Sequence, residues 1–254
     1  MTMHQLLVHD RGPALWREHK PLDEILMLRE TTPEQVWSAT YQGVPTPPGG
    51  YIFKRAWWRG QHRYDIHDAG LIDQCYARYI SWDTAMKDKD SSDYSAYVVG
   101  DLLADYRLLI RYGYQKKLEF PDLPAEIEAV AQRWNWDGKL RAVIVEDKAS
   151  GTSAIQTLWA TADATIAHLI TPFIPTTDKV TRAKQASVWC KNGSVLLPAL
   201  DPDLIWLADF EDRLFTFPEI IDKDIVDAFD QLVLYCEGTL EYGYRARQGD
   251  MVTS

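Results

Sequence analysis

Residues 141–151 read RAVIVEDKASG, an apolar run that ends in the acid Glu146 and leads into a turn of small residues. The run from Ala142 to Val145 is apolar without alternation, which is typical of a strand buried on both faces of a sheet. Such strands occur in α/β folds, where helices cover both faces. Side chains at the ends of these strands often form active sites, although most single acids there are solvated turn residues.

The segments around this strand predict three strands in a meander, followed by alternating helices and strands. Capping acids and apolar residues at helical spacing mark the helices, and turn residues bound the strands. Strands are expected at 76–83, 95–104, 105–115, 141–147, 165–173 and 194–198, and helices at 121–136, 153–162, 178–193, 201–218 and 222–243. This order favours the α/β class, with a mixed β-sheet (a β-meander, then alternating β and α elements) and helices on both faces.

The first part of the chain lacks the long periodic pattern of apolar residues that the rest shows. It holds a short predicted helix at 31–42, and the loop GVPTPPGG follows at 43–50. We therefore expect a linker-like N-terminal segment at 1–70, a folded domain at 71–245 and a C-terminal tail at 246–254.

Composition restricts the class of protein. The chain has 254 residues and a formal net charge of −10, which argues against strong non-specific nucleic-acid binding by the whole surface. Its three cysteines show neither CxxC nor Cys/His spacing, which indicates a reducing compartment and no structural zinc site. No apolar run approaches the roughly 20 residues of a membrane span, and the first residues, MTMHQLLVHDRGP, lack the apolar region of a signal peptide. A cytoplasmic location without membrane contact is expected.

Acidic residues recur at the expected element boundaries. Asp83 ends the first strand, Glu146 ends the strand of RAVIVEDKASG, and two acids, Asp224 and Asp227, begin the last helix. If the two strands are adjacent and parallel, their acids lie side by side, and the helix could deliver a third. Clustered carboxylates in a partly buried site repel one another and need a positive partner. Oxygen ligands favour Mg²⁺ or Mn²⁺, and two such ions can act together on a phosphodiester. Taken singly, each acid has an ordinary role as a turn or helix-start residue.

Several motifs occur in an order that points to a family. YISWDTAMKDKDSSDYSAYVVG (79–100) and VIVEDKASG (143–151) each place an acid at a strand end. PFIPTTDKVTRAKQASVWCKNGSVLLP spans 172–198, and FPEIIDKDIVDAFDQ spans 217–231. TTPEQVWSATYQGVPTPPGGYIFKRAWW, at 31–58, resembles a segment that joins a motor domain to a nuclease. As an ordered set, these stretches resemble the C-terminal nuclease domain of the large terminase subunit of tailed bacteriophages.

The resemblance covers about residues 30–240 and implies an RNase H-like fold for the domain at 71–245. It implies a metal-dependent endonuclease that cleaves double-stranded DNA concatemers during genome packaging, with two Mg²⁺ or Mn²⁺ ions. The implied catalytic acids are Asp83, Glu146 and Asp224, the implied metal ligands are these three and Asp227, and Asp93 matches a further recurrent acid. The implied partners are double-stranded DNA, the terminase ATPase domain, the small terminase subunit and the portal, in the cytoplasm of the bacterial host.

Two departures from the family's pattern stand out. Lys223, between Asp222 and Asp224, replaces one of two adjacent acids, so it could weaken one metal site or contact a phosphate. The chain also has no GxxxxGK[ST] loop to hold nucleotide phosphates. By itself it is therefore not expected to be the ATP-driven motor.

Basic residues near these motifs are candidates for contact with the DNA backbone. Lys148 follows the second acid, and Lys179 and Arg182 share a face of the helix at 178–193. Together with Lys223 they form the predicted DNA-binding set, although solvated basic side chains are the commoner case. Two other functions stay open at this point: an RNase H-like junction resolvase or integrase-type nuclease, and a non-cleaving module that docks on the packaging motor or portal.

Overall fold

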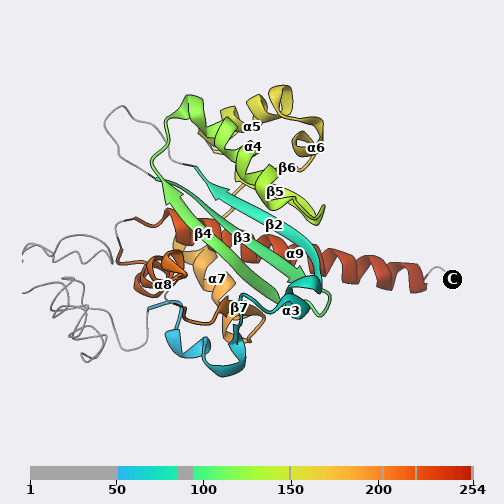
Figure 1. Cartoon of the computed structure of the whole chain (residues 1–254). Coiled ribbons are helices and arrows are strands. Elements are labelled where there is room, and N and C mark those ends of the chain that lie inside the picture. The colour runs from blue at the N-terminus through green and yellow to red at the C-terminus, as the bar shows by residue number, and fades with distance from the viewer. Residues whose placement is uncertain (1–50, 85–93, 149, 202, 221, 253–254) are drawn as a thin grey trace, which may run out of the picture. The chain divides into compact units, whose positions relative to one another are not determined.

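The computed structural model describes residues 51–84, 94–148, 150–201, 203–220 and 222–252 (Figure 1). The chain divides into two units between Tyr51 and Ile52, and the described helices and strands all belong to the second unit. The helix predicted at 31–42 and the loop predicted at 43–50 lie outside the described residues, as does Asp93.

A mixed sheet forms the centre of this unit. Its strands are β1 Arg63–Tyr64, β2 Cys75–Asp83, β3 Ser95–Leu103, β4 Leu108–Lys116, β5 Leu140–Glu146, β6 Ile170–Phe173 and β7 Val195–Pro198. Within the described part of the chain they form one seven-stranded sheet in the order β1-β7-β4-β3-β2-β5-β6. β2, β3 and β4 form an antiparallel meander, whereas β5 runs parallel to β2 and β6 parallel to β5. On the other side, β7 runs parallel to β4 and the short β1 parallel to β7.

Helices cover both faces of the sheet (Figure 1). They are α3 Ala69–Asp73, α4 Leu123–Trp134, α5 Ser150–Thr161, α6 Ala164–Ala167, α7 Lys179–Lys191, α8 Ile205–Thr216 and α9 Asp224–Val252, with 3-10 turns at Arg55–Trp57, Gly60–His62 and Phe120–Asp122. α4, α5 and α6 pack on one face, and α7, α8 and α9 pack on the other. None of the described helices has a stretch long and apolar enough to cross a membrane. The predicted α/β fold, a mixed sheet between two layers of helices, is confirmed.

The alternation of side chains along β5 explains the apolar run at its centre. Ala142 and Ile144 are buried in the core beneath α7, α8 and α9, and Val143 and Val145 are buried in the core beneath α4, α5 and α6. Both faces of this strand are therefore covered, as its unbroken apolar sequence predicts. The next residue, Glu146, has the parity of Ala142 and Ile144, so it points to the face covered by α7 and α9.

Residues 52–64 contribute to the core, although their sequence predicts a linker-like segment. The ring of Phe53 meets that of Phe229 on α9 edge to face, with the two ring centroids 5.6 Å apart. Trp58 donates a hydrogen bond from Nε1 to the carbonyl oxygen of Val195, at 2.9 Å. Because buried aromatic pairs and satisfied indole N–H groups both stabilise a core, this segment is packed as part of the folded unit.

Several element boundaries differ from the predicted ones, and β1 and α3 have no predicted counterpart. The two largest differences in boundary lie at 165–173 and after residue 243. The strand expected at 165–173 is a helical turn, α6, followed by the shorter strand β6. Asp163 caps that turn, because its carboxylate accepts hydrogen bonds from the backbone N–H and from the hydroxyl of Thr165, at 2.8 and 2.5 Å. At the other end of the chain, α9 continues to Val252, where a tail was expected from residue 246.

Candidate active site

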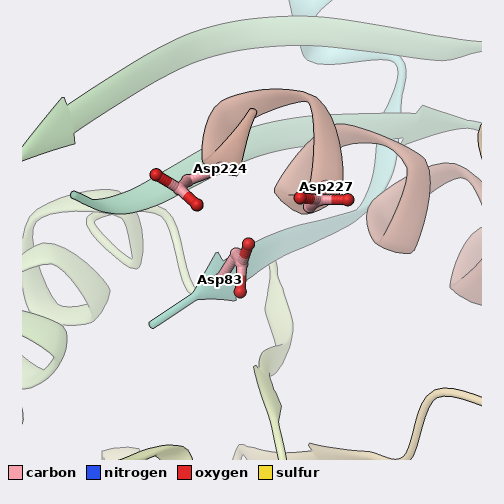
Figure 2. A group of neighbouring side chains, drawn as sticks. All are labelled: Asp83, Asp224 and Asp227. Atoms are coloured by element: carbon pink, nitrogen blue, oxygen red, sulfur yellow. The ribbon is translucent and has the colours of Figure 1, made fainter. Parts of the chain in front are cut away.

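Three acids from two elements meet at one end of the sheet (Figure 2). Asp83 is the last residue of β2, and Asp224 and Asp227 lie at the start of α9. One carboxylate oxygen of each acid lies within 4.8 Å of those of the other two. Asp83 and Asp227 are buried, with 7% and 0% of their surfaces exposed, and Asp224 is half-buried. The structure thus brings together three of the four acids that the sequence singles out as ligands.

Local geometry explains why these side chains converge. Asp83 has the parity of the β2 residues that pack beneath α9, so the period-two alternation of the strand points it to the same side. Asp224 and Asp227 are three residues apart and share one face of their helix. Gln231 holds the helix against β2 by donating from Nε2 to the carbonyl oxygen of Trp82, at 3.3 Å. A strand end and a helix start are therefore fixed beside each other.

Glu146 lies beside this trio at the end of β5. β5 is parallel to β2, and the pairing of Trp82 with Val145 leaves Asp83 and Glu146 as the next residues on the two strands. The expectation that these strands are adjacent and parallel is confirmed. The Glu146 side chain is 8% exposed, and among the described residues its Oε2 has no hydrogen bond. A charged neighbour is Arg182, whose Nη2 lies 3.7 Å from that oxygen.

Two cations of α7 face the acids, which the sequence does not indicate. Lys179 begins the helix, and its Nζ lies 3.4 Å from Asp83 Oδ2 and also contacts Asp227 Oδ2. Arg182, one turn later, places Nη2 3.5 Å from Asp227 Oδ1 and Nε 3.4 Å from Asp230 Oδ1. The shared face of the two cations therefore turns toward carboxylates. Only 4% of the Arg182 side chain is exposed, which leaves little surface for a DNA phosphate, the contact predicted for it.

Asp230 is a buried acid that the motifs do not single out. It lies three residues after Asp227, on a neighbouring position of the same helix face. It is 0% exposed, and its Oδ2 has no hydrogen bond among the described residues. Burial raises its pKa well above the usual range, and the charge of Asp227 adds to the rise. The i, i+3, i+6 spacing of three acids on one helix is the signal in the sequence that could have identified it.

Burial and mutual repulsion change the protonation of these acids. Burial raises the pKa of Asp83 well above its usual range, and Lys179 opposes this rise. Three neighbouring carboxylates add to it, those of Asp227, Glu146 and Asp224. Burial likewise raises the pKa of Asp227, against the effect of Lys179. For Lys179, burial lowers the pKa, but Asp83 and Asp227 outweigh burial and raise the pKa above its ordinary value. The cluster therefore favours a bound cation or a proton.

The raised pKa of Asp83 predicts a stability difference that depends on pH. In the unfolded chain this carboxyl ionises near pH ~4, whereas in the folded, metal-free protein it holds its proton to higher pH. As pH rises above about 4, the free energy of unfolding of wild type should therefore fall relative to that of Asp83→Asn. The fall should continue until pH exceeds the raised pKa of the folded protein. Below about pH 4 the difference should not change with pH. Urea unfolding of both proteins in EDTA measures the difference. A loss that appears only as pH falls would contradict the direction of the shift.

The backbone around Glu146 leaves no room for a side chain at Gly151. A Cβ at that position would lie 1.8 Å from the carbonyl oxygen of Glu146 and 3.2 Å from Oγ1 of Thr84. Because Gly151 stands in the first turn of α5, the helix can approach the end of β5 this closely only with glycine there. Gly151, at the end of RAVIVEDKASG, thus allows the first turn of α5 to pack against the backbone of Glu146.

Gly151→Ala is expected to destabilise the protein by about 1–3 kcal/mol, because the start of α5 must move away from Glu146. Gly238→Ala is the matched control, since Gly238 also lies in a helix and a Cβ there meets nothing within 4 Å. The control is expected to leave stability unchanged or to raise it by roughly 0.5–1 kcal/mol. Chemical denaturation measures both, and equal stabilities of the two variants would argue against the close approach.

The other two predicted DNA contacts lie close to the acids in the chain. Lys148 is exposed, two residues beyond Glu146. Lys223 is half-buried, and its Nζ lies 5.9 Å from the centre of the Phe217 ring, within reach of a cation–π interaction. Its carbonyl oxygen accepts a hydrogen bond from the N–H of Asp227 at 3.0 Å, in the first turn of α9. The lysine that departs from the family's pattern therefore helps to start the helix that carries the acids.

The donor set fits a hard divalent cation. The convergent atoms are all carboxylate oxygens, which Mg²⁺ and Mn²⁺ prefer. Glu146 Oε2, buried and without a hydrogen bond among the described residues, is a further oxygen beside them. The repulsion that raises the pKa of Asp83 is relieved when a cation enters. The residues therefore suit metal binding, and Asp83, Asp224 and Asp227 provide the convergent oxygens.

Solved structures similar to the chain include three terminase proteins. The large terminase of a thermophilic bacteriophage, in complex with ATP-gamma-S, is 12% identical with a TM-score of 0.52, and the match covers 84% of this chain and 54% of that one. The large terminase nuclease from the thermophilic phage G20c, with bound zinc, is 19% identical with a TM-score of 0.44, covering 61% and 78%. The human cytomegalovirus terminase nuclease domain, soaked with Mn and bound to an inhibitor, is 14% identical with a TM-score of 0.47, covering 68% and 88%.

The likeness to the large terminase in complex with ATP-gamma-S shows a shared fold, and the chain spans about half of that protein's length. A search of curated proteins gives no match. The family model described as the terminase RNaseH-like domain matches residues 80–215, more than half of the chain. The matched range contains the ends of β2 and β5, with Asp83 and Glu146, and all of α7. The chain therefore belongs to the terminase RNaseH-like domain family.

Proposed function

We propose that the chain is a metal-dependent endonuclease that cuts double-stranded DNA concatemers during phage genome packaging, as the nuclease part of a terminase large subunit. The observation that carries this proposal is the convergence of Asp83, Asp224 and Asp227, whose carboxylate oxygens lie within 4.8 Å of one another. Membership of the terminase RNaseH-like domain family supports it. So does the buried Glu146 beside the trio.

The proposed catalytic acids are Asp83, Glu146 and Asp224, and with Asp227 they would hold two divalent ions, Mg²⁺ or Mn²⁺. When bound, such ions supply Lewis-acid catalysis of phosphodiester hydrolysis. The protein's own contribution is to position the carboxylates, because the ends of β2 and β5 and the start of α9 are held by cores on both faces of the sheet. Groups fixed in this way need little reorganisation when a substrate arrives.

Basic residues around the acids have two proposed roles. Arg182 neutralises Asp227 and Asp230 from a buried position, which favours their ionised forms. The exposed Lys148 and the half-buried Lys223 would contact backbone phosphates. Because phosphate contacts carry no base information, we expect cleavage with little sequence preference and DNA binding that weakens steeply as salt increases.

The proposed partners follow from the place of such a nuclease in a large terminase. It would work with an ATPase domain, a small terminase subunit and a portal, in the cytoplasm of the host cell. Because the chain has a net charge of −10, it attracts DNA weakly by itself. A covalent connection to a DNA-holding motor would therefore favour DNA binding by the nuclease. Linkage to a motor that holds DNA raises the effective DNA concentration at the nuclease.

Cleavage of supercoiled plasmid DNA by the purified full chain tests the proposal. With Mn²⁺ or Mg²⁺ we expect nicked and linear products, and with EDTA we expect none. Plasmids of unrelated sequence should be cut at similar rates. Plasmid that stays intact at high protein and metal concentrations would refute nuclease activity of this chain.

A second candidate is a non-cleaving module that docks on the packaging motor or portal. A specific observation favours it: Lys179 and Arg182 already neutralise the buried carboxylates, as in a purely structural ion-pair network. A docking module would leave plasmid intact with every metal, and Mn²⁺ would not change its unfolding temperature. The nuclease is expected to show both effects.

A further inference from the structure

Lys179 lies where a divalent cation would meet the acids. Its Nζ is 3.4 Å from Asp83 Oδ2 and also contacts Asp227 Oδ2. Both acids belong to the trio whose oxygens converge within 4.8 Å. A divalent ion bound to those oxygens would stand close to the ammonium, and like charges at such a separation repel strongly in a buried site. The ammonium and a metal ion therefore compete for the same oxygens.

The two α7 cations that contact the acids, Lys179 and Arg182, differ in how they are held. The Arg182 side chain is 4% exposed, and it is held by the carbonyl oxygen of Thr177 at 3.3 Å and by Asp230 at 3.4 Å. The Lys179 side chain is 44% exposed, at the first position of the helix. A flexible four-carbon stem with this exposure can turn toward solvent without disturbing the helix. Arg182 is thus the fixed cation of the site, and Lys179 is the exchangeable one.

The site also contains an oxygen that neither cation satisfies. Glu146 Oε2 is buried and has no hydrogen bond among the described residues, and Arg182 Nη2 lies 3.7 Å from it. An unsatisfied buried carboxylate oxygen destabilises the folded protein. A divalent ion carries twice the charge of an ammonium and accepts more oxygen ligands. Lys179 is therefore an incomplete substitute for a metal ion at this site.

We propose that Lys179 is the internal counter-ion of the acid cluster, which stabilises the metal-free protein, is displaced when a divalent cation binds, and thereby lowers the metal affinity of the site. This inference rests on the proposed metal-dependent function and adds the residue that sets how much metal the site requires. It also explains how several buried carboxylates can fold together before any metal arrives.

Binding of Mn²⁺ to the full chain, measured by isothermal titration calorimetry, tests the inference. Lys179→Met removes the charge and keeps an unbranched side chain, and it is expected to bind Mn²⁺ at least about tenfold more tightly than wild type. In EDTA the variant should unfold at a lower temperature than wild type, and Mn²⁺ should raise its unfolding temperature by more. Lys179→Gln, which keeps a hydrogen-bond donor near Asp227, should change both quantities in the same directions.

Lys184→Met is the matched control, because Lys184 lies on the same helix and is exposed. It should bind Mn²⁺ as wild type does. Equal or weaker Mn²⁺ binding by the Lys179 variants would overturn the counter-ion role while leaving the metal site intact. Absence of Mn²⁺ binding by wild type and all variants would overturn the counter-ion role together with the proposed metal-dependent function.

Discussion

Asp83→Asn is expected to slow metal-dependent plasmid cleavage by at least about a thousand-fold, because the metal contribution of several kcal/mol is lost and each 1.4 kcal/mol is worth about tenfold. Asp83 is the acid of the trio that comes from the sheet, and it is 7% exposed. Asparagine keeps the shape of the side chain but offers a neutral oxygen in place of a charged one. The rate at which supercoiled plasmid becomes nicked at saturating Mn²⁺ measures the effect.

Asp105→Asn is the control for this prediction. Asp105 is an exposed acid in the turn before β4, where it pairs with Arg107 at 2.8 Å, so its replacement should leave the cleavage rate unchanged. Glu146→Gln and Asp224→Asn should behave like Asp83→Asn, because they remove the other proposed catalytic acids. Cleavage at the wild-type rate by a folded Asp83→Asn variant would show that this acid is not a ligand.

Arg78→Met is expected to destabilise the protein by about 3–5 kcal/mol, since it removes one side of a buried ion-pair network. Arg78 lies on β2 and is 1% exposed. It donates from Nε to Asp101 Oδ1 at 2.6 Å and from Nη1 to Asp137 Oδ1 at 2.8 Å. Asp101 is 0% exposed, and Arg111 is its other cationic partner, at 2.8 Å. Loss of the arginine removes the ion pair of Asp137 and leaves the buried Asp101 with Arg111 in place of two guanidinium partners. Guanidinium chloride unfolding measures the change.

Arg107→Met provides the comparison for the Arg78 network. Arg107 pairs with Asp105 at 2.8 Å, and the two side chains are 39% and 51% exposed. Exposed pairs of this kind contribute less than about 1 kcal/mol, because water and salt screen them. A similar loss of stability in Arg78→Met and Arg107→Met would mean that burial is not what makes the Arg78 network important.

Six of the seven described strands could be predicted because their sequence signals are local, whereas the two-residue strand β1 has no such signal. An unbroken apolar run such as the one from Ala142 to Val145 indicates coverage on both faces, and the structure has β5 between two cores. The placement of Asp83 beside Glu146 followed once the two strands were taken as adjacent and parallel, which they are. The strand expected at 165–173 was right for Ile170–Phe173 and wrong for the residues before it, because a short apolar run does not distinguish a strand from a helical turn. The hydrogen bonds from Thr165 to the Asp163 carboxylate favour the helical turn over a strand at 164–167.

The partners of the basic residues could not be predicted in the same way. Lys179 and Arg182 share a helix face, and that spacing is the same whether the face meets solvent or carboxylates. The packing of α7 beside α9 determines what the two side chains contact, and it turns both of them toward Asp227. The buried Asp230 was not predicted as part of the site for a related reason. A charged residue in a long helix normally lies on the solvated face.

The edge-to-face contact between Phe53 and Phe229 has a mechanical consequence. Phe229 stands between Asp227 and Asp230 in the sequence of α9, so the chain that enters the folded unit rests on the helical turn that carries two buried acids. Close-packed interiors transmit small displacements instead of absorbing them. A substitution that shifts Phe53 would therefore be felt by Phe229 and by the helical turn between Asp227 and Asp230. The segment at 52–64, which Trp58 also anchors through Val195, is thus in direct contact with the part of α9 that carries two of the buried acids.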